Sequence, residues 1–285
     1  MVGQKNLLSA VDALIKKNTF PRFAILSGDK GSGKKLIADM VAHKLCGTVI
    51  NIGIKVDDIR DMIKSAYKLT APCVYIIADA DNMSLAAKNA LLKVTEEPPN
   101  NAYFIMTLQD ANRTLDTIRS RGTVFYMEPY TLLEIAEFIK TNIGCDEISR
   151  TFVVSMDLCE TPGDVITLNS YDIKEFYDYV ELVVDNIATV SGANSFKIGD
   201  KINLKKDDTK YDLTLFLRAF TTICSNRAGD EMIAGNKSEM QMFLNWVKIT
   251  YKYLRELGIN GINKLATFDC WILEIREASF DSSGS

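Results

Sequence analysis

A glycine-rich segment near the N-terminus has the residue types and the spacing that bind phosphate. Residues 28–35 read GDKGSGKK; they follow a short apolar run and precede a stretch with helical spacing. Glycines at such a turn let backbone N–H groups surround phosphate oxygens, and a lysine at the end of the loop reaches the terminal phosphates. The candidate phosphate-binding residues are Gly28, Gly31, Gly33, Lys34 and Lys35. We interpret the segment as a P-loop by descent; the alternative is a glycine-rich turn that no longer holds phosphate.

The residues that hold Mg²⁺ beside a working P-loop are missing at two positions. The residue after the loop lysine should be Ser or Thr, whose hydroxyl binds the metal, but Lys35 stands there and an ammonium has no lone pair. A second apolar run ends at Ala78, where the metal-binding Asp should be, and Asp79 takes the place of the water-activating Glu. The alternative for Asp79 and Asp81 is that they cap the next helix.

These two losses bear directly on catalysis, because Mg²⁺ and positioned charge carry most of the acceleration of phosphoryl transfer. We therefore expect no useful ATP hydrolysis by the chain, no bound metal and no required cofactor. Residual binding of ATP or ADP stays open.

Short apolar runs alternate with helical stretches over the first 128 residues. The spacing predicts strands at 23–26, 49–54, 73–78, 102–108 and 124–127, and helices at 5–17, 33–45, 56–69, 84–97 and 115–120. Such alternation indicates βαβ crossovers and a mostly parallel sheet, so the fold class of this part is α/β. The runs are apolar without a polar alternation, as expected for strands covered on both faces.

The pattern becomes almost entirely helical after Pro129. Thr131 and Glu134 have the spacing of a capping box and open a helix that is expected to end near residue 144. Further helices are expected at 146–158, 162–170, 172–190, 211–226, 236–257 and 262–278, with a charged loop at 201–210. We divide the chain into an α/β module at 1–128, a three-helix segment at 129–171 and an all-α domain at 172–285.

Composition excludes several classes of protein. The 285 residues carry 33 basic and 37 acidic side chains, and the formal net charge of −4 gives no general attraction to nucleic acid or to an anionic membrane. The six cysteines are scattered and one histidine is present, so a local zinc module is not expected. No apolar run reaches the ~18 residues of a membrane span, and the N-terminus lacks the pattern of a signal peptide. We expect a cytoplasmic protein with no membrane contact.

Two further segments resemble motifs of the AAA+ subunits of bacterial clamp loaders. Residues 88–99 read KNALLKVTEEPP, similar to the family signature NALLK-x-LEEPP with Thr95 in place of Leu. Residues 114–121 read TLDTIRSR, which resembles the family's Ser-Arg-Cys region with Gly122 in place of Cys. The resemblance implies an AAA+ P-loop module with a RecA-like parallel sheet, then a helical lid and an all-α, collar-like oligomerisation domain. The four-cysteine zinc module that many relatives carry is absent after Cys46.

The resemblance also implies roles for single residues. Arg121 resembles the arginine finger that reaches in trans to the nucleotide of a neighbouring subunit, where a permanently charged guanidinium suits the developing phosphate charge; the alternative is an ordinary surface arginine. Thr107 lies where sensor 1 would be, although a turn-forming threonine is an alternative. Asp164 stands in the place of the sensor 2 arginine, where a carboxylate would repel phosphate.

Within this family, the degenerate ATPase motifs resemble those of the delta prime type of DNA polymerase III subunit. That resemblance implies a non-catalytic subunit that supports ATP-driven loading of the sliding clamp on primed DNA. The implied partners are the gamma or tau ATPase subunits, the delta subunit, the sliding clamp and, through the complex, primed DNA. Two alternatives stay open: an ATP-hydrolysing motor subunit of the gamma or tau type, and a DNA-binding replication accessory protein.

Overall fold

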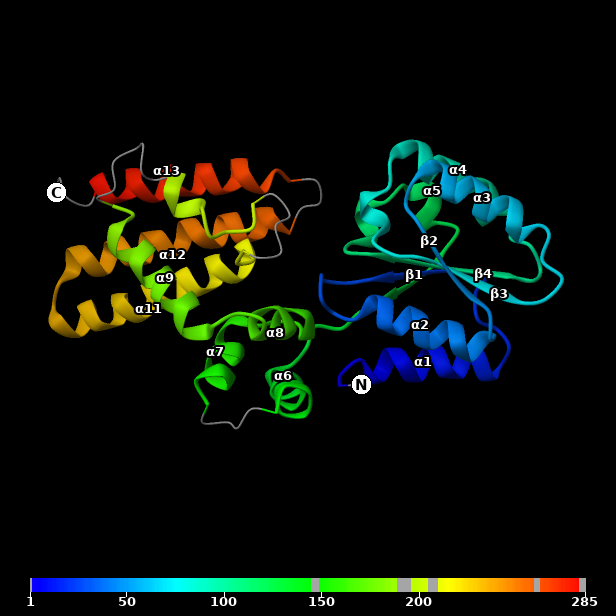
Figure 1. Ribbon diagram of the computed structural model, residues 1–285, viewed down its shortest axis with the longest axis horizontal. Coiled ribbons are helices and arrows are strands. Elements are labelled where there is room, and N and C mark those ends of the chain that lie inside the picture. Colours follow the sequence, from blue (N-terminus) through cyan, green and yellow to red (C-terminus); the bar gives the residue numbers. More distant parts are fainter. Residues whose placement is uncertain (1, 145–148, 189–195, 205–209, 259–261, 282–285) are drawn as a thin grey trace. The chain divides into compact units, whose positions relative to one another are not determined.

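The computed structural model describes residues 2–144, 149–188, 196–204, 210–258 and 262–281 (Figure 1). Parts of two expected helices, 146–148 and 189–190, and residues 205–209 of the expected loop lie outside them. Contacts group the chain into two compact units. The first unit is Met1–Phe138 with Glu160–Gly163, and the second is Ile139–Cys159 with Asp164–Ser285. The expected division at residues 128 and 171 stays a prediction, and each unit is described separately below.

A five-stranded parallel sheet forms the centre of the first unit, which confirms the predicted α/β class. The strands are β1 (Phe23–Ser27), β2 (Val49–Ile52), β3 (Cys73–Ile77), β4 (Ala102–Leu108) and β5 (Thr123–Tyr126), in the order β2-β3-β4-β1-β5. The central strands β1 and β3 are buried along their whole length, as predicted. The edge strands β2 and β5 are partly exposed, because each has a neighbour on one side only.

Helices cover both faces of this sheet (Figure 1). One face carries α1 (Lys5–Lys16) and α2 (Lys34–Leu45), and the other carries α3 (Val56–Ala66), α4 (Leu85–Glu96) and α5 (Asp116–Arg119). Successive strand residues point to opposite faces, so Ala24 and Leu26 pack under α1 and α2 whereas Phe23 and Ile25 pack under the other helices.

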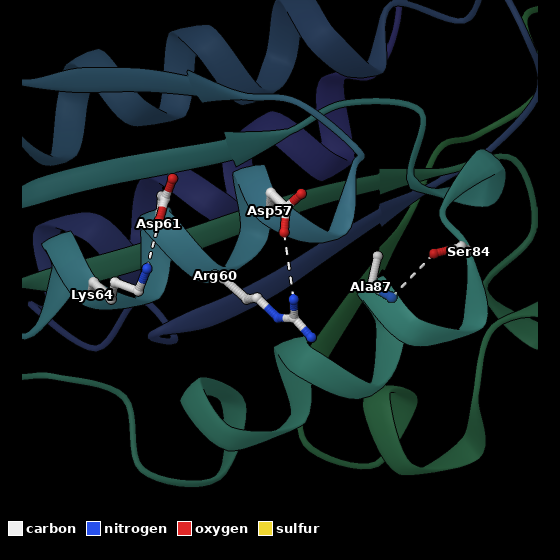
Figure 2. A network of polar contacts seen from close by, with 6 residues as sticks. All are labelled: Asp57, Arg60, Asp61, Lys64, Ser84 and Ala87. Carbon is white, nitrogen blue, oxygen red and sulfur yellow. Dashed lines mark hydrogen bonds and ion pairs between the residues drawn. The ribbon is translucent and has the colours of Figure 1, made fainter.

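Local ion pairs lie on the outer face of α3, and a side-chain cap lies at the start of α4 (Figure 2). On α3, Arg60 lies 3.4 Å from Asp57, and Lys64 lies 2.8 Å from Asp61. These ion pairs are three residues apart, the spacing at which side chains on a helix surface are neighbours. At the start of α4 the Ser84 hydroxyl accepts the backbone N–H of Ala87 at 3.2 Å and so caps the helix.

The continuous part of the first unit ends with α6 (Leu132–Phe138), whose start confirms the predicted capping box. The backbone N–H of Thr131 donates to Glu134 Oε2 at 2.9 Å, and the N–H of Glu134 donates to Thr131 Oγ1 at 3.3 Å. Two short 3-10 turns complete this unit, η1 (Ala80–Asn82) and η2 (Ala111–Arg113).

The second unit is helical in the residues that the structure describes. Its elements are η3 (Ile139–Ile143), α7 (Arg150–Leu158), α8 (Pro162–Asn169), α9 (Ile173–Asn186), η4 (Phe196–Gly199), α11 (Leu213–Ala234), α12 (Lys237–Leu257) and α13 (Lys264–Asp281), with Pro162 and Gly163 grouped with the first unit. Along the described parts of the chain, no helix combines the length and the apolar character needed to cross a membrane.

Aromatic rings from α11, α12 and α13 fill the core of the second unit. Trp271 is fully buried and lies edge-on to Phe220, with ring centroids 4.9 Å apart. A buried hydroxyl holds the two tryptophans together: Thr250 Oγ1 accepts the indole N–H of Trp271 at 3.0 Å and donates to the carbonyl of Trp246 at 2.7 Å. The core therefore contains a polar group, and that group has its partners.

The Thr250 hydroxyl generates a stability prediction. Thr250→Val leaves the buried indole N–H of Trp271 without an acceptor, and we expect a loss of about 1–3 kcal/mol in the free energy of unfolding. Thr250→Ser keeps the hydroxyl and removes one methyl group, for which we expect a loss of about 1 kcal/mol. Urea unfolding followed by tryptophan fluorescence is suitable, because Trp246 and Trp271 are the chain's two tryptophans. A valine variant as stable as the wild-type chain would contradict the prediction.

Candidate functional site

The glycine loop lies at the edge of the sheet where the parallel strands end. Gly28 follows β1 and Gly33 is the N-cap of α2. Strand pairing sets Ser27 beside Leu108, so β4 ends next to the start of the loop. The loop that follows β3 is joined to the same edge, since the backbone N–H of Asp79 donates to Thr107 Oγ1 at 3.0 Å. The structure therefore gathers the predicted loop residues, Asp79 and Thr107 at one edge.

Lys34 is bonded to its own loop. Its side chain is buried, and its Nζ donates to the carbonyl of Gly28 at 2.8 Å and to that of Asp29 at 2.7 Å. Burial lowers the pKa of Lys34 below its usual value, while the carboxylates of Asp79, Asp81 and Asp29 act in the opposite direction. The ammonium expected to face phosphate thus already has two backbone acceptors and lies within the field of three acids.

The start of α8, which is grouped with the first unit, lies against the glycine loop. The N–H of Gly163 donates to the carbonyl of Gly31 at 3.0 Å, and Gly31 adopts a positive φ of 81°, a backbone region that favours glycine. The approach is so close that a Cβ built on Gly163 would lie 2.4 Å from the Gly31 Cα. The Tyr130 hydroxyl donates to the carbonyl of Ser32 at 2.8 Å. The loop is therefore held in place by the chain itself.

The donor set at the loop does not fit Mg²⁺. Lys35 lies in the first turn of α2 with its side chain exposed, and it offers no oxygen in the place of the metal-binding hydroxyl. Ala78 offers none after β3. The nearby Asp81 has one carboxylate oxygen committed to the backbone N–H of Gln109, at 2.8 Å. Neither of the two positions at which a P-loop enzyme binds the metal can therefore ligate it.

The alternative that Asp79 and Asp81 cap the following helix is wrong. Ser84 caps α4, and Asp79, although it precedes η1, makes no side-chain capping bond. Asp79 is instead held in the left-handed region at φ 51°, which short polar residues tolerate. Asp81 ties the loop after β3 to the end of β4 through Gln109. Asp81 therefore joins the loops at the strand ends through its carboxylate, and Asp79 joins them through its backbone N–H.

Arg121 lies outside the glycine loop, and its guanidinium is bonded to residues of two helices, α4 and α5. One guanidinium nitrogen donates to the Thr117 carbonyl in α5 at 2.6 Å, and the other donates to Glu96 Oε1 at the end of α4, also at 2.6 Å. Among the described residues, its polar partners lie on α4 and α5 and none lies in the glycine loop. The Arg121 side chain is 31% exposed, so part of the guanidinium remains available.

Glu96 is a residue to which the sequence analysis assigned no role. Glu96 belongs to the EEPP end of the motif in residues 88–99, and that motif could have drawn attention to it. Nothing in the spacing of the sequence pairs it with an arginine 25 positions later.

The expectation that the Asp164 carboxylate would repel phosphate stays a prediction, but the structure gives this carboxylate a partner. The carboxylate pairs with Arg218 of α11 at 2.9 Å, within the second unit. The same guanidinium nitrogen donates to the Leu158 carbonyl at 3.1 Å. The acid is thus neutralised by a cation from a position 54 residues later, and it links α8 to α11.

Comparisons with known proteins agree with this architecture. Residues 49–131 match the family model described as "DNA polymerase III, delta subunit". DNA polymerase III subunit gamma of Buchnera aphidicola subsp. Acyrthosiphon pisum is 27% identical over 253 residues, which is 75% of this chain and 70% of that protein. The replication factor C small subunit of Haloarcula marismortui is 26% identical over 164 residues, 53% of this chain and 50% of that protein.

One solved structure supports the fold. The RuvB Holliday junction branch migration motor of Thermotoga maritima superposes with a TM-score of 0.51 at 19% identity, covering 79% of this chain and 77% of that one. At this identity the likeness concerns the fold alone.

The parallel sheet and the glycine loop between β1 and α2 define a P-loop α/β fold, and the likeness to RuvB supports that fold. The family match and the curated relatives make the likeness narrower: they indicate a clamp-loader protein that is similar to the gamma subunit of DNA polymerase III and to the small subunit of replication factor C. Thr107 and Arg121, whose roles were inferred from that resemblance, occupy well-defined positions, and their roles stay predictions.

The contact between Gly31 and Gly163 generates a prediction for the loop. Gly163→Ala places a methyl group against the Gly31 backbone, and we expect a local loss of about 1–3 kcal/mol because the two segments must separate. Hydrogen exchange of peptides that cover residues 28–33 should become faster. Gly47→Ala is the matched control, since nothing lies within 4 Å of a Cβ at Gly47. Unchanged protection in the Gly163 variant would count against the contact.

Proposed function

We propose that this protein is a non-catalytic clamp-loader subunit of the delta prime type, which supports ATP-driven loading of the sliding clamp on primed DNA. The observation that carries the proposal is the pair of residues at the metal positions, Lys35 and Ala78. Phosphoryl transfer depends on Mg²⁺ to neutralise and orient the phosphates. A P-loop that cannot ligate the metal at either position retains the architecture of an ATPase without its chemistry.

The state of Lys34 supports the same proposal. To bind a phosphate, its ammonium would have to leave the carbonyls of Gly28 and Asp29, which it contacts at 2.8 and 2.7 Å. A phosphate would also have to compete with the carboxylates of three nearby acids, which already stabilise the charged form of Lys34. The proposal requires no cofactor of this subunit, and it leaves residual ATP or ADP binding open.

The chemical contribution of the subunit, under this proposal, is Arg121 acting in trans. The guanidinium is permanently charged, and it presents several N–H donors in a planar fork that matches phosphate. Its two bonds, to Thr117 and Glu96, leave other N–H groups of the same fork for a further acceptor. The acceptor would be the nucleotide held by a neighbouring gamma or tau subunit.

The partners of the proposed subunit follow from the same assignment. They are the gamma or tau ATPase subunits, the delta subunit and the sliding clamp, with primed DNA reached through the complex. The net charge of −4 favours contact with DNA through partners, because phosphate binding is driven largely by basic side chains that release counterions.

A second candidate function is an ATP-hydrolysing motor subunit. The observation that favours it is the naming of curated relatives: those of Buchnera aphidicola are called subunit gamma, and that of Bacillus subtilis, 27% identical over 152 residues, is called subunit tau. The chain covers 27% of the length of the latter. The lysine and alanine at the metal positions weigh against this candidate.

ATP turnover by the purified chain distinguishes the two candidates. We expect no Mg²⁺-dependent hydrolysis above the background rate, because the loop has lost both metal ligands. The measurement is phosphate release at saturating ATP and Mg²⁺, with Lys34→Ala as the control. Hydrolysis that disappears in the Lys34→Ala variant would favour the motor candidate.

Substitution of Arg121 tests the proposed role in trans. In the complex assembled with the clamp-loader ATPase subunit of the same organism, we expect Arg121→Ala to lower turnover at the one site it completes by about 10³-fold, a typical effect for an arginine finger. Arg119→Ala is the matched control, because Arg119 is paired within its own segment with Asp116 and Asn112. Equal turnover in the two variants would refute the role of Arg121.

A further inference from the structure

We infer that Glu96 is a positioning residue for Arg121, an inference that rests on the proposed role of Arg121 in trans. Glu96 is the last residue of α4, and its Oε1 accepts a hydrogen bond from one terminal nitrogen of the guanidinium at 2.6 Å. The other terminal nitrogen donates to the Thr117 carbonyl at 2.6 Å. Two anchors, from α4 and α5, therefore hold the two ends of one planar group.

A second acceptor determines the direction of the guanidinium. Arg121 follows α5 (Asp116–Arg119), and the carbonyls at the end of that short helix attract a cation. One bond to such a carbonyl leaves the group free to rotate about it. The ion pair with Glu96 removes this freedom, because a planar group held at both terminal nitrogens has a defined plane.

Glu96 is suited to this task because its backbone is anchored in the core. The two preceding residues, Val94 and Thr95, are buried, and the Thr95 hydroxyl donates to the Leu92 carbonyl at 2.9 Å. The Glu96 side chain itself is 53% exposed. The carboxylate thus extends from a rigid helix end into solvent, where an arginine directed at another subunit must lie.

The exposure of the pair explains why Glu96 positions the guanidinium without sequestering it. An ion pair open to solvent holds its partners weakly. The guanidinium keeps N–H groups that neither Glu96 nor Thr117 uses. A phosphate from a neighbouring subunit can therefore bind an arginine whose side chain is already oriented. The conformational entropy of that long side chain is lost when the ion pair forms, so binding of the phosphate does not carry this cost.

Neighbouring charges do not share this arrangement. Glu97, the next residue, is exposed and is bonded through its backbone carbonyl to the Tyr67 hydroxyl at 3.3 Å. Asp116, the acid in α5, pairs with Arg119 at 2.8 Å. Among the described residues the carboxylate on Arg121 is that of Glu96.

The experiment compares Glu96→Gln with Glu97→Gln in the complex assembled with the clamp-loader ATPase subunit of the same organism. Glutamine keeps the size and an acceptor oxygen but removes the charge. We expect Glu96→Gln to lower the kcat of ATP turnover about threefold to tenfold, with KM unchanged, because a less ordered guanidinium acts in the transition state less often. Glu97→Gln should leave both constants unchanged. Glu96→Asp, which retains the charge on a shorter arm, should give an intermediate kcat.

A double variant separates this inference from the proposed function. If Glu96 acts through Arg121, adding Glu96→Gln to Arg121→Ala lowers kcat no further. A normal kcat for Glu96→Gln, a raised one, or a further loss in the double variant would overturn the positioning role while Arg121→Ala still reports on the proposed function. If Arg121→Ala itself has no effect, the proposed function fails first. Complex formation, checked by gel filtration, shows that each variant assembles.

Discussion

The parallel pairing of β1, β3 and β4 is the constraint on which the rest of the structure depends. Because parallel strands end at the same edge of a sheet, the loops after all three strands meet there. Two hydrogen bonds join these loops: Ser27 Oγ accepts the N–H of Ala111 at 2.9 Å in a buried bond, and Thr107 Oγ1 accepts that of Asp79 at 3.0 Å in a partly buried one. The edge is therefore rigid even though it lacks the residues that ligate Mg²⁺.

The pattern of apolar residues predicted the strands and helices well, because burial on a sheet depends on local residue type. The strand expected at 102–108 has those bounds, and the capping box at Thr131 formed as expected. The partial exposure of β2 and β5 could not be read from their apolar sequences, since edge position is a property of strand order. The spacing of glycines and lysine located the loop, and the family resemblance located Arg121, but neither identified their contacts.

The sequence could not predict which side chains pair with each other. The pairing of Asp164 with Arg218 joins residues 54 positions apart, and that of Glu96 with Arg121 joins residues 25 apart. Charge alone does not choose among the many possible partners at such separations, because the choice is made by the packing of helices. The same limit applies to Lys34, whose acceptors are carbonyls that every residue carries.

Under the proposed function, the loop and Arg121 belong to a subunit that acts on a neighbour's nucleotide rather than on its own. The most direct test is ATP turnover by the clamp-loader ATPase subunit of the same organism, measured with the wild-type chain, with Lys34→Ala and with Arg121→Ala. The account predicts that the wild-type chain stimulates turnover, that Lys34→Ala stimulates it equally and that Arg121→Ala does not. Stimulation that is lost with Lys34→Ala and kept with Arg121→Ala would contradict it.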